Sequence, residues 1–333
     1  MDDESISFII ISRNEEKRIQ ACIESVIECS KEYKNSEIIL VDSASTDRTV
    51  DIAKRYPIKI IQLKPSWPLS PAAGEYTGFL HSKGDYVCFI GGDMILNAEW
   101  LKEALPFLKK DDVAGVSGNI INIFEDGCSP LVVKRINRSC ELLKFGEVSS
   151  LGGPAMFRRN ILEDVGCYHP FLKAGEEAEL SCRIRAKGYK LLRLSTPMVT
   201  HNVKSMSLSA YIKKYCWGYA KAVGSSIRFS LRTNKHVFWM RLPEIIQAMF
   251  FNLFLLYIIF SLFTLIKGYI LFTITTIAGY FLLFILSVRR RKDIKDALLS
   301  ILIVHIWALA VFIGFLKDLP DPQQYPRDPI IIK

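Results

Sequence analysis

The sequence predicts an α/β domain with a mostly parallel sheet, followed by an interfacial helical segment and C-terminal transmembrane helices. Two observations lead to this prediction. Short β-branched runs alternate with helical stretches through the first two hundred residues, whereas the uncharged apolar runs long enough to cross a bilayer lie in the last third of the 333 residues. Strands that alternate with helices indicate parallel strands joined by right-handed crossovers. The hydrophobic share of 50% is high for a soluble enzyme.

The first domain shows a regular order of elements. Strands are predicted at 6–11, 37–41, 58–63 and 86–90, and the helices between them at 15–31, 46–54 and 71–81. In open parallel sheets, ligands bind beyond the carboxyl ends of the strands. The residues that directly follow each predicted strand are therefore the first candidates for binding and chemistry.

Three apolar runs follow in the last third of the chain. Each is close to the roughly 20 residues that the hydrocarbon core of a bilayer requires, and we interpret them as transmembrane helices at 245–266, 268–288 and 297–316. The predicted organisation is then an N-terminal domain at 1–204, an amphipathic juxtamembrane segment at 205–243, the transmembrane part at 244–317 and a Pro-rich tail at 318–333.

The distribution of basic residues predicts the orientation. Arg289, Arg290, Arg291, Lys292 and Lys295 lie between the second and third apolar runs, whereas only Lys267 lies between the first and second. By the positive-inside rule, we expect a multi-pass protein of the cell membrane with its N-terminal domain in the cytosol. A complete third crossing would leave the tail outside, whereas an interfacial third segment would leave it cytosolic.

The formal net charge of +9 also has a local explanation. Residues 208–241 interleave aromatic with basic side chains, a pattern typical of helices that lie at a membrane interface. Because this segment precedes the first apolar run, we expect anionic lipid headgroups rather than nucleic acid as its partner. The eight cysteines are scattered without a C-x-x-C pair, which predicts reduced thiols rather than a disulfide framework or zinc ribbon.

Polar residues follow three of the predicted strands. Neither the G-x-G-x-x-G pattern of dinucleotide-binding folds nor a P-loop is present. An acid at a strand end can accept hydrogen bonds from a nucleobase or ribose, and another can hold a divalent cation that neutralises a diphosphate. Asp42 and Asp93 suit these two roles, whereas we interpret Asp47 as a helix cap. The candidate nucleotide-binding residues are Ser12, Asn14, Glu15, Asp42, Ser43 and Gly92.

The ordered set of motifs resembles the inverting glycosyltransferases of family 2, which bind nucleotide sugars in a GT-A fold. Residues 9–15 resemble the family's first strand, which ends in N-E, and ILVDSASTDRT at 39–49 resembles V-D-x-x-S-T-D-x-T. GDYVCFIGGD at 84–93 resembles G-D-x-x-x-F-x-D-x-D. GGPAMFRRN at 152–160 and EEAELSCRIRAKGY at 176–189 resemble the acceptor-side segment and the helix that carries the family's catalytic acid.

The resemblance implies a role for each matching residue. Glu177 takes the position of the catalytic base, with Glu176 and Glu179 as supporting acids whose negative charge raises its pKa. Asp93, together with His201, would hold Mg²⁺ or Mn²⁺. The cation would stabilise the departing nucleoside diphosphate, while the base removes the proton of the incoming hydroxyl.

The sequence also departs from the family pattern. Gly91-Gly92-Asp93 replaces D-x-D, which removes one of two carboxylates. Glu75 stands where the family usually has the arginine of A-R-N-x-G, which removes a cation expected near the nucleotide. Glu177 replaces an aspartate and reaches one methylene further.

The predicted function is a membrane-bound transfer of sugar from a nucleoside-diphosphate sugar to a hydroxyl of a lipid-linked saccharide at the cytosolic face. An acidic base favours a hydroxyl acceptor, because a polyprenyl phosphate oxygen is already ionised at neutral pH. A polyprenyl-phosphate glycosyl synthase and a non-catalytic membrane scaffold with a degenerate transferase fold remain alternatives. The candidate contacts for the acceptor's anionic head are Arg158, Arg159, Lys213 and Lys214.

Overall fold

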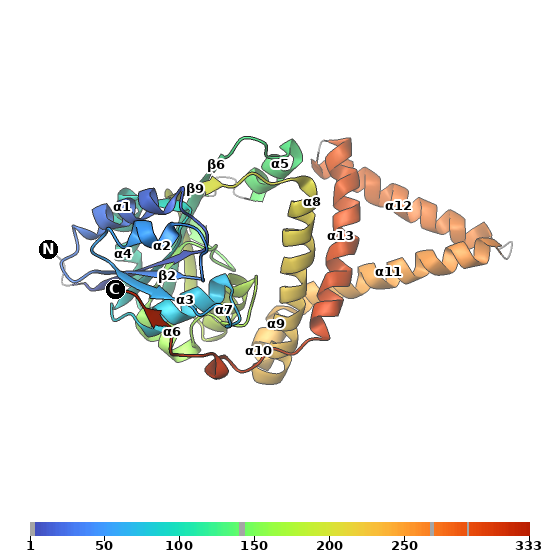
Figure 1. Cartoon of the computed structure of the whole chain (residues 1–333). Coiled ribbons are helices and arrows are strands. Elements are labelled where there is room, and N and C mark those ends of the chain that lie inside the picture. Colours follow the sequence, from blue (N-terminus) through green and yellow to red (C-terminus); the bar gives the residue numbers. More distant parts are fainter. Residues whose placement is uncertain (1–3, 140–143, 267–269, 292) are drawn as a thin grey trace. The chain divides into compact units, whose positions relative to one another are not determined.

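The computed structural model describes residues 4–139, 144–266, 270–291 and 293–333 (Figure 1). The chain forms two compact units. The first unit contains residues 1–206 together with 319–333, and the second contains residues 207–318. Each unit is described by itself below.

The first unit contains one mixed, mostly parallel sheet. In the described residues the strand order is β10-β3-β2-β1-β4-β8-β6-β9-β5, with β7 paired to β9. β1, β2, β3 and β4 are mutually parallel, as predicted, whereas β5, β8 and β10 each run antiparallel to their neighbours. The strands are β1 (Ile6–Ser12), β2 (Glu37–Asp42), β3 (Lys59–Gln62), β4 (Tyr86–Gly91), β5 (Met94–Leu96), β6 (Val113–Phe124), β7 (Gly146–Glu147), β8 (Ala155–Arg158), β9 (Lys190–Val203) and β10 (Ile330–Ile331).

The predicted strands and helices in the first ninety residues are confirmed, with shifts of a few residues at their ends. The largest shift is at α1, which begins four residues later than predicted because Glu15 and Arg18 form a turn ahead of the helix. The helices of this unit are α1 (Ile19–Ser30), α2 (Thr49–Ala53), α3 (Pro71–Leu80), α4 (Ala98–Leu108), α5 (Pro130–Ser139), α6 (Arg159–Val165) and α7 (Glu176–Ala186).

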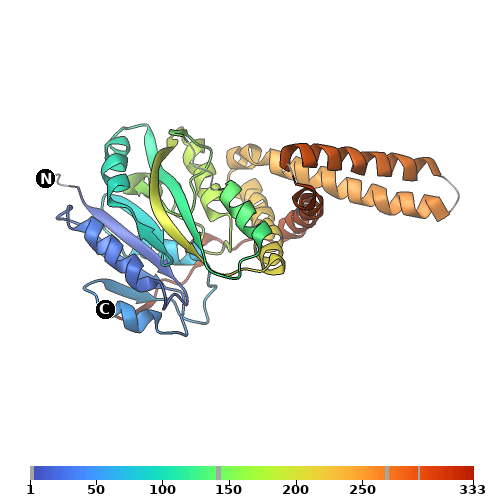
Figure 2. The same cartoon turned by 90° about the horizontal axis from the view of Figure 1, so that it is seen from above.

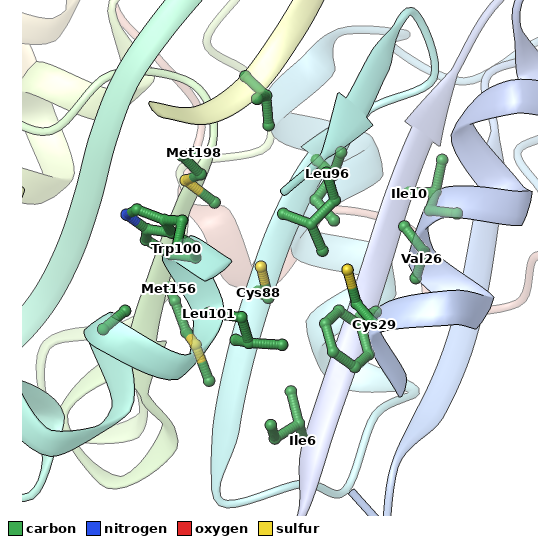
Figure 3. Packing of buried hydrophobic residues seen from close by; sticks show 14 of the residues in the cluster. Ile6, Ile10, Val26, Cys29, Cys88, Leu96, Trp100, Leu101, Met156 and Met198 are labelled. Carbon is green, nitrogen blue, oxygen red and sulfur yellow. The ribbon is translucent and has the colours of Figure 1, made fainter. Parts of the chain in front are cut away.

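Two hydrophobic clusters fill the two faces of the sheet. Alternate residues of β1 point to opposite faces, so that Ile10 joins the cluster under α1 and α4, while Ile9 joins the one under α3, α6 and α7. Figure 3 shows the first cluster, in which Trp100 of α4 packs near Met156 and Met198. These two layers of helices fix the sheet and leave the carboxyl ends of the central strands for binding.

The predicted Pro-rich tail is part of the first unit. Ile330 and Ile331 form β10, which pairs antiparallel with β3 at the edge of the sheet. Tyr325 is 2% exposed, packs edge-on against Trp67 and Tyr76, and donates a hydrogen bond from its hydroxyl to the Pro68 carbonyl at 3.0 Å. The tail therefore anchors the end of the chain to the sheet.

The second unit is helical. The juxtamembrane segment forms α8 (Leu208–Tyr211), the π-helix η1 (Ile212–Gly218), α9 (Tyr219–Thr233) and α10 (Lys235–Met240). The apolar part forms α11 (Leu242–Ile266), α12 (Ile270–Arg291) and α13 (Ile294–Phe315). α11 and α12 run antiparallel and overlap in Figure 2, whereas Figure 1 shows that they are close at one end and diverge toward the other. Lys267 and Lys292, which enter the predicted orientation, lie outside the described residues.

Two of these helices are long and apolar enough to cross a membrane, judged by length and composition. They are Ile245–Phe263 within α11 and Ile294–Phe315, which is α13. The apolar part of α12 is shorter, from Thr273 to Arg289. The seven described cysteines form no disulfide, and Cys140 lies outside the described residues.

Helices α9 and α13 cross with their backbones in contact. A Cβ added at Gly224 would overlap the Val311 carbonyl, and one added at Gly314 would overlap the Lys221 carbonyl. The Ser225 hydroxyl donates a hydrogen bond to the Gly314 carbonyl at 3.0 Å. Small residues at a helix–helix contact allow the two backbones to approach closely and so stabilise the packing of the two helices.

The burial of Tyr325 predicts a large effect of its removal. Replacing Tyr325 with Ala should lower the free energy of unfolding of the first unit by about 3 kcal/mol, as for other buried aromatic side chains. Denaturant unfolding followed by far-UV circular dichroism measures this change. Ile330→Ala is the matched control in the same tail, because Ile330 is 43% exposed and should cost well under about 1 kcal/mol. Equal effects of the two substitutions would contradict the anchor role of Tyr325.

Candidate active site

The carboxyl ends of β1 and β2 hold Asp42 in a fully buried position. Its carboxylate accepts hydrogen bonds from the Ser45 backbone N–H at 2.8 Å, from the Gln62 side chain at 2.9 Å and from the Ser45 hydroxyl. Ser12 lies opposite Asp42 in the strand register, with its hydroxyl 3.5 Å from the carboxylate. Asp42 is thus a fixed, buried hydrogen-bond acceptor at the carboxyl end of β2.

The loops after β1 and β2 are joined by hydrogen bonds. The Asn14 backbone N–H donates to the Ser45 hydroxyl, and the Asn14 side-chain oxygen accepts from the Thr46 backbone N–H, both at 2.8 Å. Asn14 and Ala44 have positive φ angles of 56° and 54°. Non-glycine residues in this conformation are uncommon and are held in place by the surrounding contacts. The two loops therefore present a preformed backbone surface, to which Ser43 also belongs.

Asp93 and His201 face each other across the β5–β9 pair. The distance between Asp93 Oδ2 and His201 Nε2 is 3.3 Å, and His201 Nδ1 lies 3.0 Å from Asn122 Oδ1. Burial alone would raise the pKa of Asp93, but the hydrogen bond and charge of His201 outweigh it and hold the pKa below its usual range. When Nδ1–H donates to Asn122, the Nε2 of His201 faces Asp93, which suits two ligands of one cation.

Asp93 and His201 provide only two protein ligands. No group of three or more His, Cys, Asp or Glu side chains with a metal-binding arrangement exists among the described residues. A Mg²⁺ or Mn²⁺ site with few protein ligands is completed by water and by substrate phosphate oxygens. The pair therefore fits a cation that arrives with a diphosphate.

Glu15 lies beside this pair but is engaged with cations of the protein. Its carboxylate accepts from Lys204 at 2.6 Å and from Arg18 at 3.2 Å. Burial raises the pKa of Glu15, and the negative charge of Asp93 adds to the rise. Lys204, which the sequence analysis did not single out, brings a positive charge toward the same strand ends.

Gly91 and Gly92 lie where neighbouring atoms leave little room for a side chain. A Cβ at Gly91 would lie 2.7 Å from Asp93 Oδ1, so a side chain there would displace the Asp93 carboxylate from its present position. A Cβ at Gly92 would lie 3.0 Å from the Ser12 Cβ, and the Gly92 backbone N–H donates to the Ile11 carbonyl at 2.8 Å. Gly92 thus allows the chain after β4 to approach β1.

Glu177 lies at the same edge of the sheet as Asp93. β8 runs antiparallel to β4 with Ala155 opposite Phe89, so that the preceding Gly153 extends toward the end of β4. A Cβ at Gly153 would lie 3.6 Å from Glu177 Oε1. Glu177 therefore lies near the segment that precedes β8, toward the end of β4 that Asp93 follows.

Two further acids are buried and have raised pKa values. Glu75 on α3 and Glu176 on α7 are 5% and 4% exposed. Burial, together with the charges of Glu176 and Glu177, raises the pKa of Glu75 well above its usual range. Burial and the charge of Glu177 raise the pKa of Glu176 to about 8, and burial raises that of Glu177. The sequence analysis noted Glu75 only as the residue that stands in place of an arginine. Its relation to α7 could not be recognised there, because α3 and α7 are about 100 residues apart in the chain.

Glu179, in contrast, has a structural role. Its carboxylate receives two hydrogen bonds from the Arg183 guanidinium, at 2.7 and 2.8 Å, one helical turn away. Arg183 also donates to the carbonyls of Val165 and Cys167. This bidentate pair fixes the loop before α7 to the helix, and the negative charge of Glu179 is neutralised there.

The interpretation of Arg158 and Arg159 as acceptor contacts is not supported. Arg158 lies opposite Tyr86 at the start of β4, whereas Asp93 follows its end. At about 3.3 Å per residue, β4 separates the two positions by roughly 17 Å. Arg158 donates to the Asp111 carbonyl, and Arg159 donates to the Gly84 carbonyl and to the Ser82 hydroxyl. These arginines stabilise the opposite edge of the sheet.

Lys213 and Lys214 belong to the second unit. Both are exposed on η1, and the Lys214 ammonium lies 5.0 Å from the Tyr215 ring centroid. Lys213 also lines a cavity of about 650 Å³ together with Trp217 and His305. A π-helical turn of this kind is rare and often marks a functional site.

Comparison with known proteins identifies the family. Residues 7–166 match the family model described as glycosyl transferase family 2. Residues 7–166 are a glycosyltransferase family 2 domain. The matched range includes the strand ends that carry Asp42 and Asp93. It ends before α7, the helix that carries Glu177.

Curated relatives of this family 2 glycosyltransferase extend the match. A poly(ribitol-phosphate) beta-glucosyltransferase of Bacillus spizizenii is 25% identical over 191 residues, which cover 56% of this chain and 30% of the relative. A Methanococcus voltae enzyme named as a dolichyl N-acetyl-alpha-D-glucosaminyl phosphate glucuronosyltransferase is 26% identical over 240 residues, which cover 67% of this chain and 74% of the relative. The chain spans less than two thirds of the length of the first curated relatives that it matches.

A solved structure agrees with the fold. The crystal structure of Staphylococcus aureus TarS residues 1–349, in complex with UDP-GlcNAc, superposes with a TM-score of 0.52 at 18% identity. The superposition covers 67% of this chain and 65% of that chain. At this identity the likeness concerns the fold, which is the α/β GT-A type expected from the sequence.

Proposed function

We propose that this protein transfers a sugar, with inversion, from a nucleoside-diphosphate sugar to a hydroxyl of a lipid-linked saccharide at the cytosolic face of a membrane. The observation that carries the proposal is the placement of Glu177 at the same strand-end edge as Asp93 and His201. A diphosphate-binding group and a base are the two requirements of a single in-line displacement.

The donor half of the proposal rests on the strand ends. Asp42 and the joined loops offer acceptors and backbone groups to a nucleoside, while Asp93 and His201 would hold Mg²⁺ or Mn²⁺ against its diphosphate. A bound cation would supply electrostatic stabilisation to the departing diphosphate. The UDP-GlcNAc complex of the similar TarS structure supports a uridine nucleotide as the first donor to test.

The acceptor half rests on Glu177. A carboxylate with a raised pKa suits the removal of a proton from a sugar hydroxyl as the bond to the anomeric carbon forms. The acceptor implied by the name of the Methanococcus voltae relative, a lipid-linked N-acetylglucosamine, supports this acceptor class. A synthase that glycosylates bare polyprenyl phosphate would need no such base.

The membrane part of the proposal follows from the path of the chain. The chain leaves the first unit after Met206 and returns to it at Leu319, and β10 of the returning tail pairs with β3. A chain that leaves a folded unit on one side of a bilayer and returns to that unit crosses the bilayer an even number of times. Three complete crossings do not meet this condition, whereas two crossings do.

We assign the two crossings to α11 and α12. The apolar part of α12 has 17 residues, which is about the lower limit for a transmembrane helix. The basic sequence at 289–295 then remains on the cytosolic side with the first unit. α13 would lie along α9 at the interface, because the Gly224–Gly314 contact ties it to a helix that carries Lys221, Arg228 and Arg232.

The role of Glu177 predicts a selective loss of transfer. Glu177→Gln should lower kcat by about 10²-fold to 10⁴-fold, the usual contribution of a general base, while donor binding stays intact. Purified protein with labelled UDP-sugars is assayed against a lipid-linked saccharide and against bare polyprenyl phosphate. Glu163→Gln, at an exposed position of α6, is the matched control. Unchanged activity of the Glu177 variant, or transfer to polyprenyl phosphate alone, would contradict the hydroxyl acceptor.

Donor binding should depend on a cation and on Asp93. With a nucleotide at 100 times its Kd, a bound ligand stabilises the folded protein by about 2.7 kcal/mol, which a thermal-shift assay detects. We expect this shift with one nucleoside diphosphate in the presence of Mn²⁺, and its loss in Asp93→Ala but not in the surface control Asp51→Ala. No shift with uridine, guanosine or thymidine nucleotides in folded protein would favour the non-catalytic scaffold.

The even number of crossings is tested by chemical labelling in membranes. Cysteines introduced at Ile270, Lys295 and Lys333 of a cysteine-free variant are exposed to a membrane-impermeant thiol reagent from either side. We expect Ile270→Cys to react from the outside, and Lys295→Cys and Lys333→Cys from the cytosolic side. Labelling of Lys333→Cys from the outside would exclude two crossings.

A further inference from the structure

Lys204 is the first residue after β9, and its side chain links two distant segments of the first unit. Its ammonium donates a hydrogen bond to the Glu15 carboxylate, with Nζ 2.6 Å from Oε1, and another to the Asn14 carbonyl at 3.0 Å. Asn14 and Glu15 follow β1, which precedes Lys204 by about 190 residues in the chain. The lysine therefore places a positive charge directly at the carboxyl end of β1.

The backbone on both sides of Lys204 is held by hydrogen bonds. The Asn202 N–H donates to the Asp93 carbonyl at 3.0 Å, and the Ser205 N–H donates to the Glu125 carboxylate at 3.1 Å. At about 3.3 Å per residue, Lys204 follows Asn202 by roughly 7 Å. The side chain of Lys204 therefore begins near the segment that carries Asp93 and reaches the loop after β1.

Lys204 connects the two halves of the proposed donor site. On one side, Asn14 joins the loops after β1 and β2, which would bind the nucleoside. On the other side, His201 of β9 faces Asp93, with 3.3 Å between Nε2 and Oδ2. The diphosphate of a donor connects its nucleoside to its sugar, so a donor that uses both halves brings its diphosphate to the region that Lys204 spans.

The Lys204 ammonium has a donor left for an anion. A lysine has three N–H donors, and two of them are used by Asn14 and Glu15. Within the described ranges, the third has no protein acceptor. The side chain is 43% exposed, so an anionic oxygen that arrives from solvent can accept this third hydrogen bond.

Glu15 does not depend on Lys204 alone. The Arg18 guanidinium lies 3.2 Å from the Glu15 carboxylate and also pairs with Glu125. The Glu15 side chain is 10% exposed, and a carboxylate buried to this extent is costly without a cation. Because Arg18 remains as its partner, Lys204 can turn toward an anion without leaving Glu15 unpaired.

The charge of the strand ends favours this use of Lys204. Asp42 and Glu15 are buried, and Asp93 is half-buried, so three acids lie at the ends of β1, β2 and β4. A diphosphate adds further negative charge. A lysine that is already fixed at this place offsets part of it and forms the charge-assisted hydrogen bond that phosphate oxygens accept.

We propose that Lys204 binds the diphosphate of the nucleotide donor through a hydrogen bond from Nζ to a phosphate oxygen. This inference rests on the proposed function, because it requires a nucleoside-diphosphate donor. Asn14 and Glu15 hold the ammonium in place before the donor arrives, which reduces the entropy lost on binding. The loss of one charge-assisted hydrogen bond weakens binding by about 10-fold to 100-fold.

Equilibrium binding of uridine, UMP and UDP to the 333-residue protein in detergent with Mn²⁺ tests this role. Lys204→Met removes the charge but keeps a long side chain. It should weaken UDP binding by about 10-fold to 100-fold and leave uridine binding unchanged, and Lys204→Arg should retain most of the UDP affinity. The guanosine and thymidine series are measured in parallel.

Lys190→Met is the matched control. Lys190 lies at the opposite end of β9, and its ammonium pairs with the exposed Asp112 at 2.7 Å. This variant also removes an ion-paired lysine, but at a place remote from the strand ends that carry Asp42 and Asp93. It should change the affinity for none of the nucleotides.

Glu15→Gln separates a contact with the diphosphate from a structural role of the Lys204–Glu15 ion pair. The variant breaks the ion pair, keeps the lysine and removes a negative charge beside it. The affinity for UDP relative to uridine should therefore rise. If the ion pair only holds the loop after β1 in place, the ratio should instead fall as it does in Lys204→Met. This comparison decides the question even if Lys204→Met does not fold.

The outcomes distinguish this inference from the proposed function. Unchanged UDP binding in Lys204→Met, or an equal loss of uridine and UDP binding, would overturn the role of Lys204 and leave the proposed function intact. A wild-type protein that is folded but binds none of the three nucleoside diphosphates would contradict the proposed function and this inference together.

Discussion

The position of β1 between two parallel neighbours is the constraint on which the rest of the site depends. Its register sets Ser12 against Asp42 on one side and Ile11 against Gly91 on the other. Because parallel strands end at the same edge, this register brings the strand ends that carry Asp42 and Asp93 together. The glycines at the end of β4 allow this segment to lie close to β1, and the Gly92 backbone N–H donates a hydrogen bond to the Ile11 carbonyl.

The sequence was sufficient where short-range patterns determine structure. Short β-branched runs located β1 to β4 within a few residues, and Asp42 and Asp93 lie at or just after the ends of β2 and β4, as predicted. His201 was selected through the family resemblance, and its approach to Asp93 agrees with that expectation. The nucleotide, cation and acceptor roles of these residues stay predictions.

The features that sequence reasoning missed depend on contacts between distant segments. β10 is only two residues long and forms by pairing with β3, so no local sequence pattern predicts it. Arg158 and Arg159 match the family motif, but they lie at the end of β8 that is farther from Asp93. The sequence does not show this, because it depends on the antiparallel pairing of β8 with β4. In the sequence Glu75 was only a loss of positive charge, whereas in the fold its carboxyl group is buried, and burial together with the charges of Glu176 and Glu177 raises its pKa.

The anomeric configuration of the product tests the central claim most directly. A single displacement with Glu177 as base, opposite a diphosphate held at the Asp93 edge, inverts the configuration at the anomeric carbon. Nuclear magnetic resonance of the purified glycoside should therefore show a β-linked sugar from an α-linked nucleotide donor. An α-linked product from the same donor would mean retention, and it would contradict the assignment of Glu177 as the base of an inverting transfer.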